Sequence, residues 1–328
     1  MTVLVTGATG FIGEALTRSL LGAGERVRVL ARQPDRVAAI GLAVTEVVQG
    51  DITDAAAVDR AVAGCDTVFA IAGTFREPNL SDQRYHEVNV EAVRLMMDAA
   101  RRHGVRRVVH CSTVGIHGNV VGPPATEATA IRPAGIYEET KAEGDRVALS
   151  EARDGLEVVV IRPAPVYGPG DTRLVKLYNL AGRERVILLG DGRPHYHMIY
   201  IDDLVAAFRL AATTSGVAGE AFIVAGAERP TLEEVIRRIG RLTGHPAQKL
   251  VKLPAGPILL AGDLCEWLCR PFGIHPPIYR RRIEFFVNNR AYDTTKTQSR
   301  LGFAPKVGLD DGLARTLAWY RQEGLVAS

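Results

Sequence analysis

Short runs rich in β-branched residues alternate with stretches of helical period through the first half of the chain. This alternation constrains the fold more than any other feature, because strands separated by helices pair in parallel and need covering helices on both faces. We therefore predict an α/β fold built on a doubly wound parallel sheet. Its strands are expected at residues 3–6, 26–31, 45–48, 67–71, 107–111 and 156–161, with helices beginning near residues 11, 55, 82 and 136.

A glycine-rich segment follows the first predicted strand directly. Gly7, Gly10 and Gly13 are regularly spaced in Thr-Gly-Ala-Thr-Gly-Phe-Ile-Gly at 6–13. Glycines here let the backbone turn tightly and bring N–H groups and a helix N-terminus against a pyrophosphate. The segment predicts a Rossmann-type dinucleotide-binding site. Further contacts to the cofactor are expected from the intervening residues Thr9, Phe11 and Ile12.

The regular pattern ends near residue 165. Proline and glycine crowd the segment from Pro163 to Gly170, and the later segments mix helix and loop. We therefore predict two domains, a dinucleotide-binding domain at 1–165 and a smaller mixed α/β substrate-binding lobe at 166–328. A stretch around residues 200–213 is expected to return to the first domain. A chain of 328 residues, 47% of them hydrophobic, has enough apolar material for both cores.

The composition argues against several classes of partner. Forty Lys and Arg against 37 Asp and Glu leave a formal charge of only +3, too weak a bias for a nucleic-acid surface. The apolar stretch at 253–269 is interrupted by Pro, Gly, Asp and Glu, so we expect no transmembrane segment. The segment after Met1 has no signal-peptide pattern, and we expect a cytoplasmic protein. No metal site is predicted, because four scattered cysteines form neither a disulfide framework nor a ligand set: Cys65, Cys111, Cys265 and Cys269.

The end of the second predicted strand bears on the choice of cofactor. Folds that bind NAD usually carry an acidic residue there, which accepts a hydrogen bond from the ribose 2′-hydroxyl. This chain has Ala31 followed by Arg32, with Arg36 a turn later, and a cation at this point suits a 2′-phosphate. We expect NADP(H), with NAD(H) as the alternative if Arg32 only stacks on the adenine or faces solvent. Asp51, at the end of the third strand, is a candidate acceptor for the adenine amino group.

The candidate catalytic residues are Tyr137 and Lys141, four residues apart in a predicted helix. This spacing places a phenol and an ammonium group on one helix face about 6 Å apart. A neighbouring ammonium stabilises phenolate, and so favours proton exchange with an alcohol. Thr113 follows a strand whose carboxyl end should lie at the same edge of the sheet. Tyr292 and Lys296 share the spacing but lie outside the sheet pattern, and we assign them to structure.

Together these segments resemble a known family, the extended short-chain dehydrogenases/reductases of the NAD-dependent epimerase/dehydratase superfamily. The likeness covers nearly the whole chain and keeps the order of the family's motifs. Besides the glycine segment, the motifs are Gly-Asp-Ile-Thr-Asp at 50–54, Asn-Val-Glu-Ala at 89–92, Ser-Thr-Val-Gly-Ile-His-Gly at 112–118, Tyr137 with Lys141, Arg-Pro-Ala-Pro-Val-Tyr-Gly-Pro-Gly-Asp at 162–171 and Tyr-Ile-Asp-Asp-Leu at 200–204.

The resemblance implies a role for each matching residue. Tyr137 would be the acid/base, Thr113 the hydroxyl that hydrogen-bonds the substrate oxygen, and Lys141 the contact to the nicotinamide ribose. His117 and Tyr196 would stand near the substrate. Further cofactor contacts would come from Ile52, Ala70, Ala72, Ser112, Pro163 and Val166. The resemblance also implies a homodimer, formed through the helices near residues 82–103 and 136–153.

Departures from the family pattern narrow the expected reaction. Family dehydratases place Asp-Glu after the catalytic Thr, but Val114 and Gly115 follow here and cannot transfer protons. Nucleotide-sugar enzymes place an Asn against the diphosphate where this chain has Pro165, which offers neither an amide side chain nor a backbone donor. We therefore expect an NAD(P)-dependent oxidoreductase that interconverts a secondary alcohol and a ketone. The alternatives are a nucleotide-sugar 4-epimerase and a non-catalytic nucleotide-sensing scaffold.

The C-terminal third resembles the 3β-hydroxysteroid and sterol-4-carboxylate dehydrogenases, so the expected substrate is sterol-like or otherwise alicyclic. The likeness includes Ala-Gly-Glu-Ala-Phe-Ile-Val at 218–224 and Leu-Gly-Phe-Ala-Pro at 301–305. We interpret the cations at 280–282 as a solvated helix face, with a peripheral membrane contact as the alternative. A preceding group of apolar residues is expected either to line the substrate pocket or to pack in the core: Pro257, Leu260, Leu264, Trp267, Phe272 and Ile274.

Overall fold

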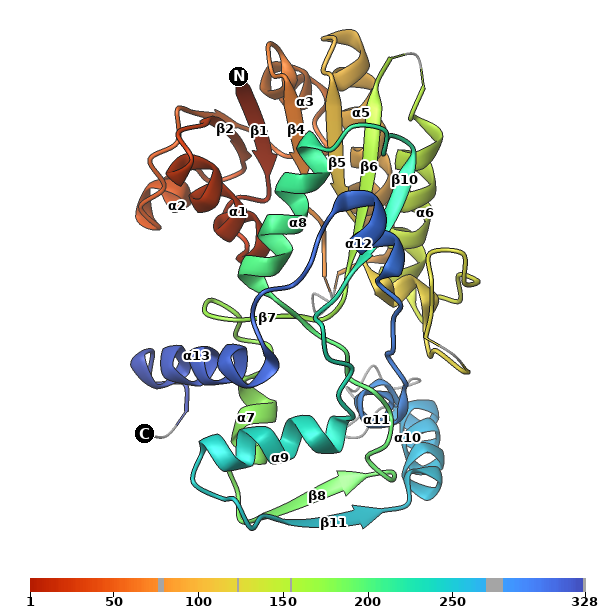
Figure 1. Cartoon of the computed structure of the whole chain (residues 1–328). Coiled ribbons are helices and arrows are strands. Elements are labelled where there is room, and N and C mark those ends of the chain that lie inside the picture. The colour runs from red at the N-terminus through yellow and green to blue at the C-terminus, as the bar shows by residue number, and fades with distance from the viewer. Residues whose placement is uncertain (76–79, 123, 154, 270–279, 327–328) are drawn as a thin grey trace.

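The computed structural model describes residues 1–75, 80–122, 124–153, 155–269 and 280–326, and a seven-stranded sheet lies at its centre (Figure 1). The strands follow the order β10-β6-β5-β4-β1-β2-β3, and all neighbouring pairs are parallel. The predicted doubly wound fold is confirmed, and each of the six predicted strands lies within two residues of its expected bounds. The observed bounds are β1 Thr2–Thr6, β2 Arg26–Ala31, β3 Glu46–Gln49, β4 Thr67–Ala70, β5 Arg107–Cys111, β6 Glu157–Pro163 and β10 Glu220–Val224.

Side chains of the sheet divide between two buried cores, because successive residues of a strand point to opposite faces. Val3 and Val5 of β1 join one apolar cluster, and Leu4 between them joins the other. Both faces of the sheet are therefore covered, which explains why its strands are apolar throughout. The first face carries α1 (Phe11–Gly22) and α8 (Ile201–Thr213), and the second carries α3 (Ala55–Val62), α5 (Ala92–Arg102) and α6 (Ile136–Ser150).

Two shorter helices complete this part of the molecule. α2 (Pro34–Ala39) follows β2 and lies against β3. α4 (Asp82–His86) leads through a π-helical turn, η1 (Glu87–Glu91), into α5. The π-helical turn packs on α6, where a Cβ on Gly144 would stand 2.1 Å from the carbonyl oxygen of Asn89. This close approach brings the two segments together beside the carboxyl edge of the sheet.

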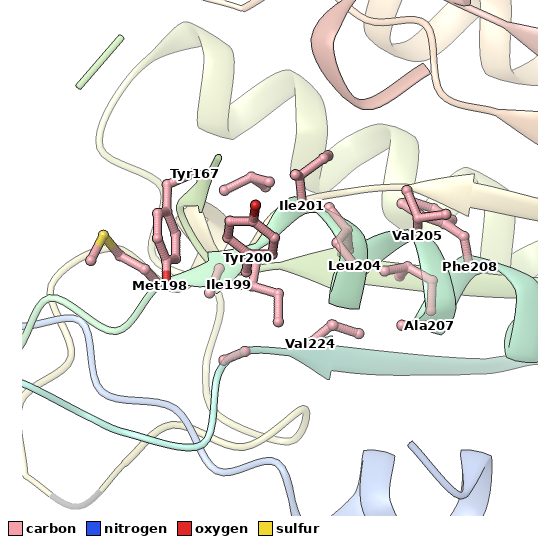
Figure 2. Packing of buried hydrophobic residues seen from close by; sticks show 14 of the residues in the cluster. Tyr167, Met198, Ile199, Tyr200, Ile201, Leu204, Val205, Ala207, Phe208 and Val224 are labelled. Atoms are coloured by element: carbon pink, nitrogen blue, oxygen red, sulfur yellow. The ribbon is translucent and has the colours of Figure 1, made fainter. Parts of the chain in front are cut away.

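The chain returns to the central sheet after residue 165. α8 packs on α1, β5 and β6, and β10 pairs with β6 at the edge of the sheet. Figure 2 shows Leu204, Val205 and Phe208 of α8 in the same apolar cluster as Val224 of β10. α12 (Thr295–Leu301) also packs on β10. The returning part of the chain is therefore longer than the expected residues 200–213, and the division at residue 165 stays a prediction.

The remaining elements form a smaller lobe beneath the carboxyl ends of the strands (Figure 1). Its two parallel strand pairs are β8 (Arg185–Leu189) with β11 (Lys249–Leu253) and β7 (Val166–Tyr167) with β9 (Ile199–Tyr200). α9 begins with a capping box between Thr231 and Glu234, which satisfies two backbone N–H groups. The helices are α7 (Val175–Ala181), α9 (Leu232–Leu242), α10 (Ala255–Cys269), α11 (Arg280–Val287) and α13 (Leu309–Gln322).

The apolar group expected at a pocket or in the core is only partly described. Pro257 and Leu260 on α10 are exposed, Leu260 by 71%, so neither packs in the core. Phe272 and Ile274, together with the side chains of Leu264, Trp267 and the arginines at 280–282, lie outside the described residues. None of the helices in the described part of the chain has the length and apolar run needed to span a bilayer.

Candidate active site

A cavity of about 790 Å³ lies between the carboxyl edge of the sheet and the smaller lobe. Its wall combines the turns after β1 to β6 with the start of α6 and with segments of the lobe. Because parallel strands end at one edge, residues far apart in sequence converge there. Most of the expected site residues line this cavity: Gly7, Thr9, Gly10, Phe11, Ile12, Gly13, Arg32, Asp51, Ile52, Ala72, Ser112, Thr113, Tyr137, Lys141, Pro163, Val166 and Tyr196.

The turn between β1 and α1 depends on its glycines. Gly7 has a φ of +71°, and a Cβ there would stand 2.9 Å from the backbone of Ala72. A Cβ on Gly13 would lie 2.1 Å from Gly7 O, so this glycine lets α1 pack against the turn. A Cβ on Gly10 would meet only Gly7 O, at 3.4 Å. The space beside Gly10, at the start of α1, is therefore open, and it fits the pyrophosphate of a dinucleotide.

Two exposed arginines line the cavity where β2 ends. Among the described residues, no carboxylate pairs with the side chain of Arg32 or Arg36. Next to them, Asp51 Oδ2 accepts from Arg84 Nη2 at 2.9 Å, and Asp51 Oδ1 accepts from the backbone and hydroxyl of Thr53. Partial burial alone would raise the pKa of Asp51, but these hydrogen bonds and the Arg84 charge hold it below its ordinary value. Arg84, which we did not predict, therefore binds the carboxylate of Asp51, the group expected to accept a hydrogen bond from the adenine amino group.

α6 carries Tyr137 in its first turn and Lys141 one turn later, and both line the cavity. The Tyr137 ring meets Phe75 edge-on, with ring centroids 4.9 Å apart. Lys141 Nζ donates to Cys111 O, at the end of β5, over 2.6 Å. Burial lowers the pKa of Lys141, while the negative charge of Asp145 acts in the opposite direction. The ammonium group is therefore anchored at the carboxyl edge of the sheet.

Thr113 caps a short 3₁₀ helix, η2 (Val114–His117), that follows β5. Its Oγ1 accepts from Gly115 N at 3.0 Å, which leaves the hydroxyl hydrogen to be donated elsewhere. Ser112 is 3% exposed, whereas Thr113 is only partly buried. Of the two hydroxyls, Thr113 is the better placed to meet a substrate oxygen.

A buried ion pair fixes α6 to the sheet. Arg162 of β6 donates from Nε and Nη2 to the two carboxylate oxygens of Asp145, each over 2.9 Å. Burial alone would raise the pKa of Asp145, but the hydrogen bonds and charge of Arg162 hold it below its ordinary value.

His110, buried in β5, has its pKa lowered to about 3 by burial and by the charge of Lys141. Within the described residues, no group of three or more His, Cys, Asp or Glu side chains is placed to hold a metal ion.

Comparison with known proteins places this site in a family. The family model that matches residues 3–225 is that of the NAD dependent epimerase/dehydratase family. The chain belongs to this family. Its resemblance to the extended short-chain dehydrogenases/reductases is confirmed. The family is NAD-dependent.

Three relatives of the family match over nearly the whole chain. Sterol demethylase protein B of Methylococcus capsulatus is 33% identical, with 99% of this chain and 100% of the relative covered. A dTDP-glucose 4,6-dehydratase of Streptomyces griseus is 32% identical, with 98% and 94% covered. A 2-alkyl-3-oxoalkanoate reductase of Stenotrophomonas maltophilia is 30% identical, with 97% and 99% covered.

Solved structures of the family agree with the fold. The crystal structure of gox2253 superposes with a TM-score of 0.82 at 27% identity, covering 99% of each chain. DesIV, a dTDP-glucose 4,6-dehydratase from Streptomyces venezuelae with NAD bound, superposes with a TM-score of 0.77 at 26% identity. The superposition covers 99% of this chain and 100% of DesIV. This chain is accordingly an enzyme of the extended short-chain dehydrogenase/reductase kind.

Two residues expected in the site from the family pattern do not line the cavity. Ala70 is 8% exposed and belongs to the apolar cluster under α3 and α5, while the following residues from Ile71 to Phe75 reach the cavity. His117 is 2% exposed, and burial together with the charge of Arg162 lowers its pKa. His117 is therefore a buried side chain whose surroundings favour its neutral form.

Tyr292, which we assigned to structure, does line the cavity. It precedes α12 and is not part of a helix, so the four-residue spacing does not place Lys296 on a shared helix face with it. Lys296 Nζ instead donates to Ala221 O at 3.0 Å and pairs with Glu220. Tyr137 with Lys141 is therefore the pair whose two members both line the cavity.

Sequence reasoning missed two further groups. Asn89, in the π-helical turn, donates to Thr140 Oγ1 at 3.1 Å and accepts from Thr74 N at 3.0 Å, and so joins α6 to the wall of the cavity. Its family motif at 89–92 was visible, but that motif alone suggested no contact. The second group comes from segments far apart in sequence, which no local motif connects: Phe75, Arg173, Leu174, Phe285 and Arg290.

Proposed function

We propose that this enzyme is an NADP(H)-preferring oxidoreductase that interconverts a secondary alcohol and a ketone on a sterol-like or other alicyclic substrate. The main support is that the candidate catalytic residues and a group of aromatic rings line the same cavity. Thr113, Tyr137 and Lys141 line the same cavity as the glycine turn. The rest of its wall includes the rings of Phe75, Tyr196, Phe285 and Tyr292, and such a wall suits a carbon skeleton. The 33% identity to sterol demethylase protein B adds to this support.

The side chains divide the chemistry among them. A nicotinamide cofactor, when bound, would supply or take up the hydride. Thr113 donates its free hydroxyl hydrogen to the substrate oxygen, and Tyr137 passes a proton to or from that oxygen. Lys141, anchored on Cys111 O, stabilises the phenolate form of the tyrosine. Gly10 and the start of α1 hold the phosphates, and Arg32 binds the 2′-phosphate.

A nucleotide-sugar 4-epimerase is the second candidate. It is favoured by the likeness to MoeE5, solved in complex with UDP-glucose and NAD, which is 27% identical with a TM-score of 0.75. Pro165 lines the cavity, where an Asn side chain would be needed to meet a diphosphate. Nucleotide-sugar members of the family often carry a phosphate-binding arginine a few residues before the segment that matches 200–204. Arg193 is the nearest candidate here, but it is exposed and does not line the cavity. These two observations favour the oxidoreductase.

Net reduction of the cofactor separates the two candidates. Purified enzyme, stripped of nucleotide, is incubated with NADP⁺ or NAD⁺ and a panel of 3β-hydroxysteroids and simpler alicyclic alcohols, and reduced nicotinamide is followed by its fluorescence. We expect reduced cofactor to accumulate over many turnovers. Retained nucleotide, with no net reduction but with conversion of UDP-glucose to its 4-epimer, would replace the oxidoreductase by the epimerase.

The family resemblance also supports a homodimer in which α5 and α6 pair with the same helices of a second copy. α5 and α6 pack on each other along one face of the sheet, so they form a ready surface for a four-helix interface. Sedimentation as a monomer at micromolar concentration would contradict this assembly.

A further inference from the structure

Away from Arg32 and Arg36, one further arginine of the cavity wall has no described carboxylate partner, and unlike those two it is half-buried between aromatic rings. Arg173 is paired with Asp171 at 2.6 Å and Arg84 with Asp51 at 2.9 Å. Arg290 also lines the cavity, but no acidic side chain in the described part of the chain pairs with it. We propose that Arg290 binds an anionic group, a carboxylate or a phosphate, on the substrate. This inference rests on the proposed function, because it concerns the substrate of the same cavity.

The contacts of Arg290 leave one edge of its guanidinium available. Its Cζ lies 5.7 Å from the ring centroids of both Tyr196 and Phe285. Nη1 donates to the carbonyl oxygens of Phe285 and Asn288, each at 3.1 Å. No described residue accepts a hydrogen bond from Nε or Nη2 of Arg290. These two atoms form the planar fork that binds a carboxylate or a phosphate through two parallel hydrogen bonds.

The backbone N–H and C=O groups of Arg290 both make hydrogen bonds, so the side chain extends from a fixed stretch of backbone. Arg290 N donates to His195 O at 2.9 Å, and His197 N donates to Arg290 O at 3.1 Å. The neighbouring Asn289 donates from Nδ2 to Val120 O at 2.9 Å and accepts from His195 N at 2.8 Å. A cation that is already positioned loses little entropy when an anion binds. This arrangement is therefore suited to recognition.

A purely structural role explains less of this arrangement. The two carbonyl contacts account for Nη1, but not for a half-buried positive charge beside two aromatic rings. Removing such a charge from water costs free energy unless a counter-charge is gained. An anion on the substrate provides that counter-charge within an otherwise apolar part of the wall.

The test compares paired substrates in Arg290→Gln, Arg290→Lys and a control variant. The control is Arg193→Gln, which removes an arginine that is 87% exposed and outside the cavity wall. The substrates are a 3β-hydroxysteroid and the same steroid bearing a ring carboxylate. In Arg290→Gln we expect the KM for the acid to rise about 10- to 100-fold, the loss expected for a charge-assisted pair. The KM for the neutral steroid and both kcat values should change less than about 3-fold.

Arg290→Lys keeps the charge but not the planar fork, so we expect it to recover only part of the affinity for the acid. Equal changes for acid and neutral steroid in Arg290→Gln, or no change for either, would contradict a carboxylate at Arg290. The Arg193→Gln enzyme should match the wild type with both substrates.

Calorimetry with UDP and with the steroid acid, on enzyme saturated with cofactor, tests phosphate against carboxylate as the anion. UDP binding that weakens at least 10-fold in Arg290→Gln assigns the subsite to a phosphate, whereas Arg290-dependent binding of the acid alone assigns it to a carboxylate. If neither ligand depends on Arg290, the inference is wrong. Because these binding measurements need no turnover, they remain informative even if wild-type enzyme transfers hydride to no steroid, the result that would overturn the proposed function.

Discussion

Arg32 and Arg36 place two positive charges in the cavity wall where β2 ends. Both are exposed, so water and salt screen them until a ligand arrives. A 2′-phosphate at this point would gain ion pairs and several charge-assisted hydrogen bonds, whereas an uncharged 2′-hydroxyl offers a guanidinium one acceptor oxygen without a negative charge. Under the proposed function, we therefore expect these two side chains to set the preference between NADP(H) and NAD(H).

We expect the double variant Arg32→Ala/Arg36→Ala to lose affinity for NADP⁺ by about 10- to 100-fold and for NAD⁺ by less than about 3-fold, because only NADP⁺ carries the additional phosphate. The measurement is calorimetric titration of nucleotide-free enzyme. Arg26→Ala is the matched control, since Arg26 is exposed at the opposite end of β2. Equal losses for both nucleotides would show that the arginines do not read the 2′-phosphate.

At the scale of elements, α6 is the helix on which the proposed chemistry depends, because it carries both Tyr137 and Lys141. Two contacts position it. The ion pair of Asp145 with Arg162 joins the later turns of α6 to β6. Asn89 in the π-helical turn donates a hydrogen bond to Thr140. A helix held at both points keeps the phenol and the ammonium group in one place relative to the strand ends.

Asp145→Asn should lower the free energy of unfolding by about 3–5 kcal/mol, because it leaves the Arg162 charge buried without its counter-charge. Urea denaturation at pH 7 measures this change. The control Asp59→Asn, in a largely exposed contact with Arg102, should leave the unfolding midpoint nearly unchanged. A midpoint for Asp145→Asn equal to that of the control would show that the buried pair does not stabilise α6.

Local patterns explain which elements could be predicted. The strands β1 to β6 and the glycine turn could be predicted because the pattern of each lies within a short run of consecutive residues. β10 was missed because its place beside β6 depends on a long connection through β7, α7, β8, β9 and α8. Arg290 was missed for a similar reason. Its position in the cavity wall follows from backbone hydrogen bonds to His195 and His197, and no sequence motif predicts these contacts.

At the scale of the whole molecule, stability should depend on pH through buried histidines in both parts of the chain. Burial lowers the pKa of His110, in the central sheet, to about 3. His197, in the lobe, is buried beside Gly226 O and has a pKa of about 4, and burial also lowers the pKa of His117. His110 and His197 stay neutral in the folded state at pH values where the histidines of the unfolded state, with a pKa of about 6.5, gain protons. His117 shifts in the same direction. The unfolded state therefore binds more protons in this range, and stability rises with pH.

We expect the free energy of unfolding to fall from about pH 6.5 downward, by up to about 1.4 kcal/mol per pH unit for each histidine that stays neutral in the folded state. Asp145 adds to the loss only below about pH 4, because its folded pKa is lowered from 3.8. Urea denaturation between pH 7.5 and about pH 5.5 follows the histidines, because the glutamates with lowered pKa values titrate in the unfolded state only near its glutamate pKa of 4.5. His110→Phe should reduce the slope by the share of one group, and a flat profile in the wild type would contradict this account.

The proposed role of Tyr137 as the proton donor and acceptor is tested most directly by single-turnover hydride transfer in Tyr137→Phe. The variant enzyme is saturated with cofactor, mixed rapidly with the alicyclic alcohol that the wild type oxidises, and followed by reduced-nicotinamide fluorescence. Tyr178→Phe is the control, because it removes a buried tyrosine hydroxyl that donates to Leu313 O outside the cavity. We predict that Tyr137→Phe binds nucleotide normally but transfers hydride at least about 100-fold more slowly, while Tyr178→Phe transfers it at the wild-type rate. Transfer by Tyr137→Phe at the wild-type rate would remove Tyr137 from the mechanism.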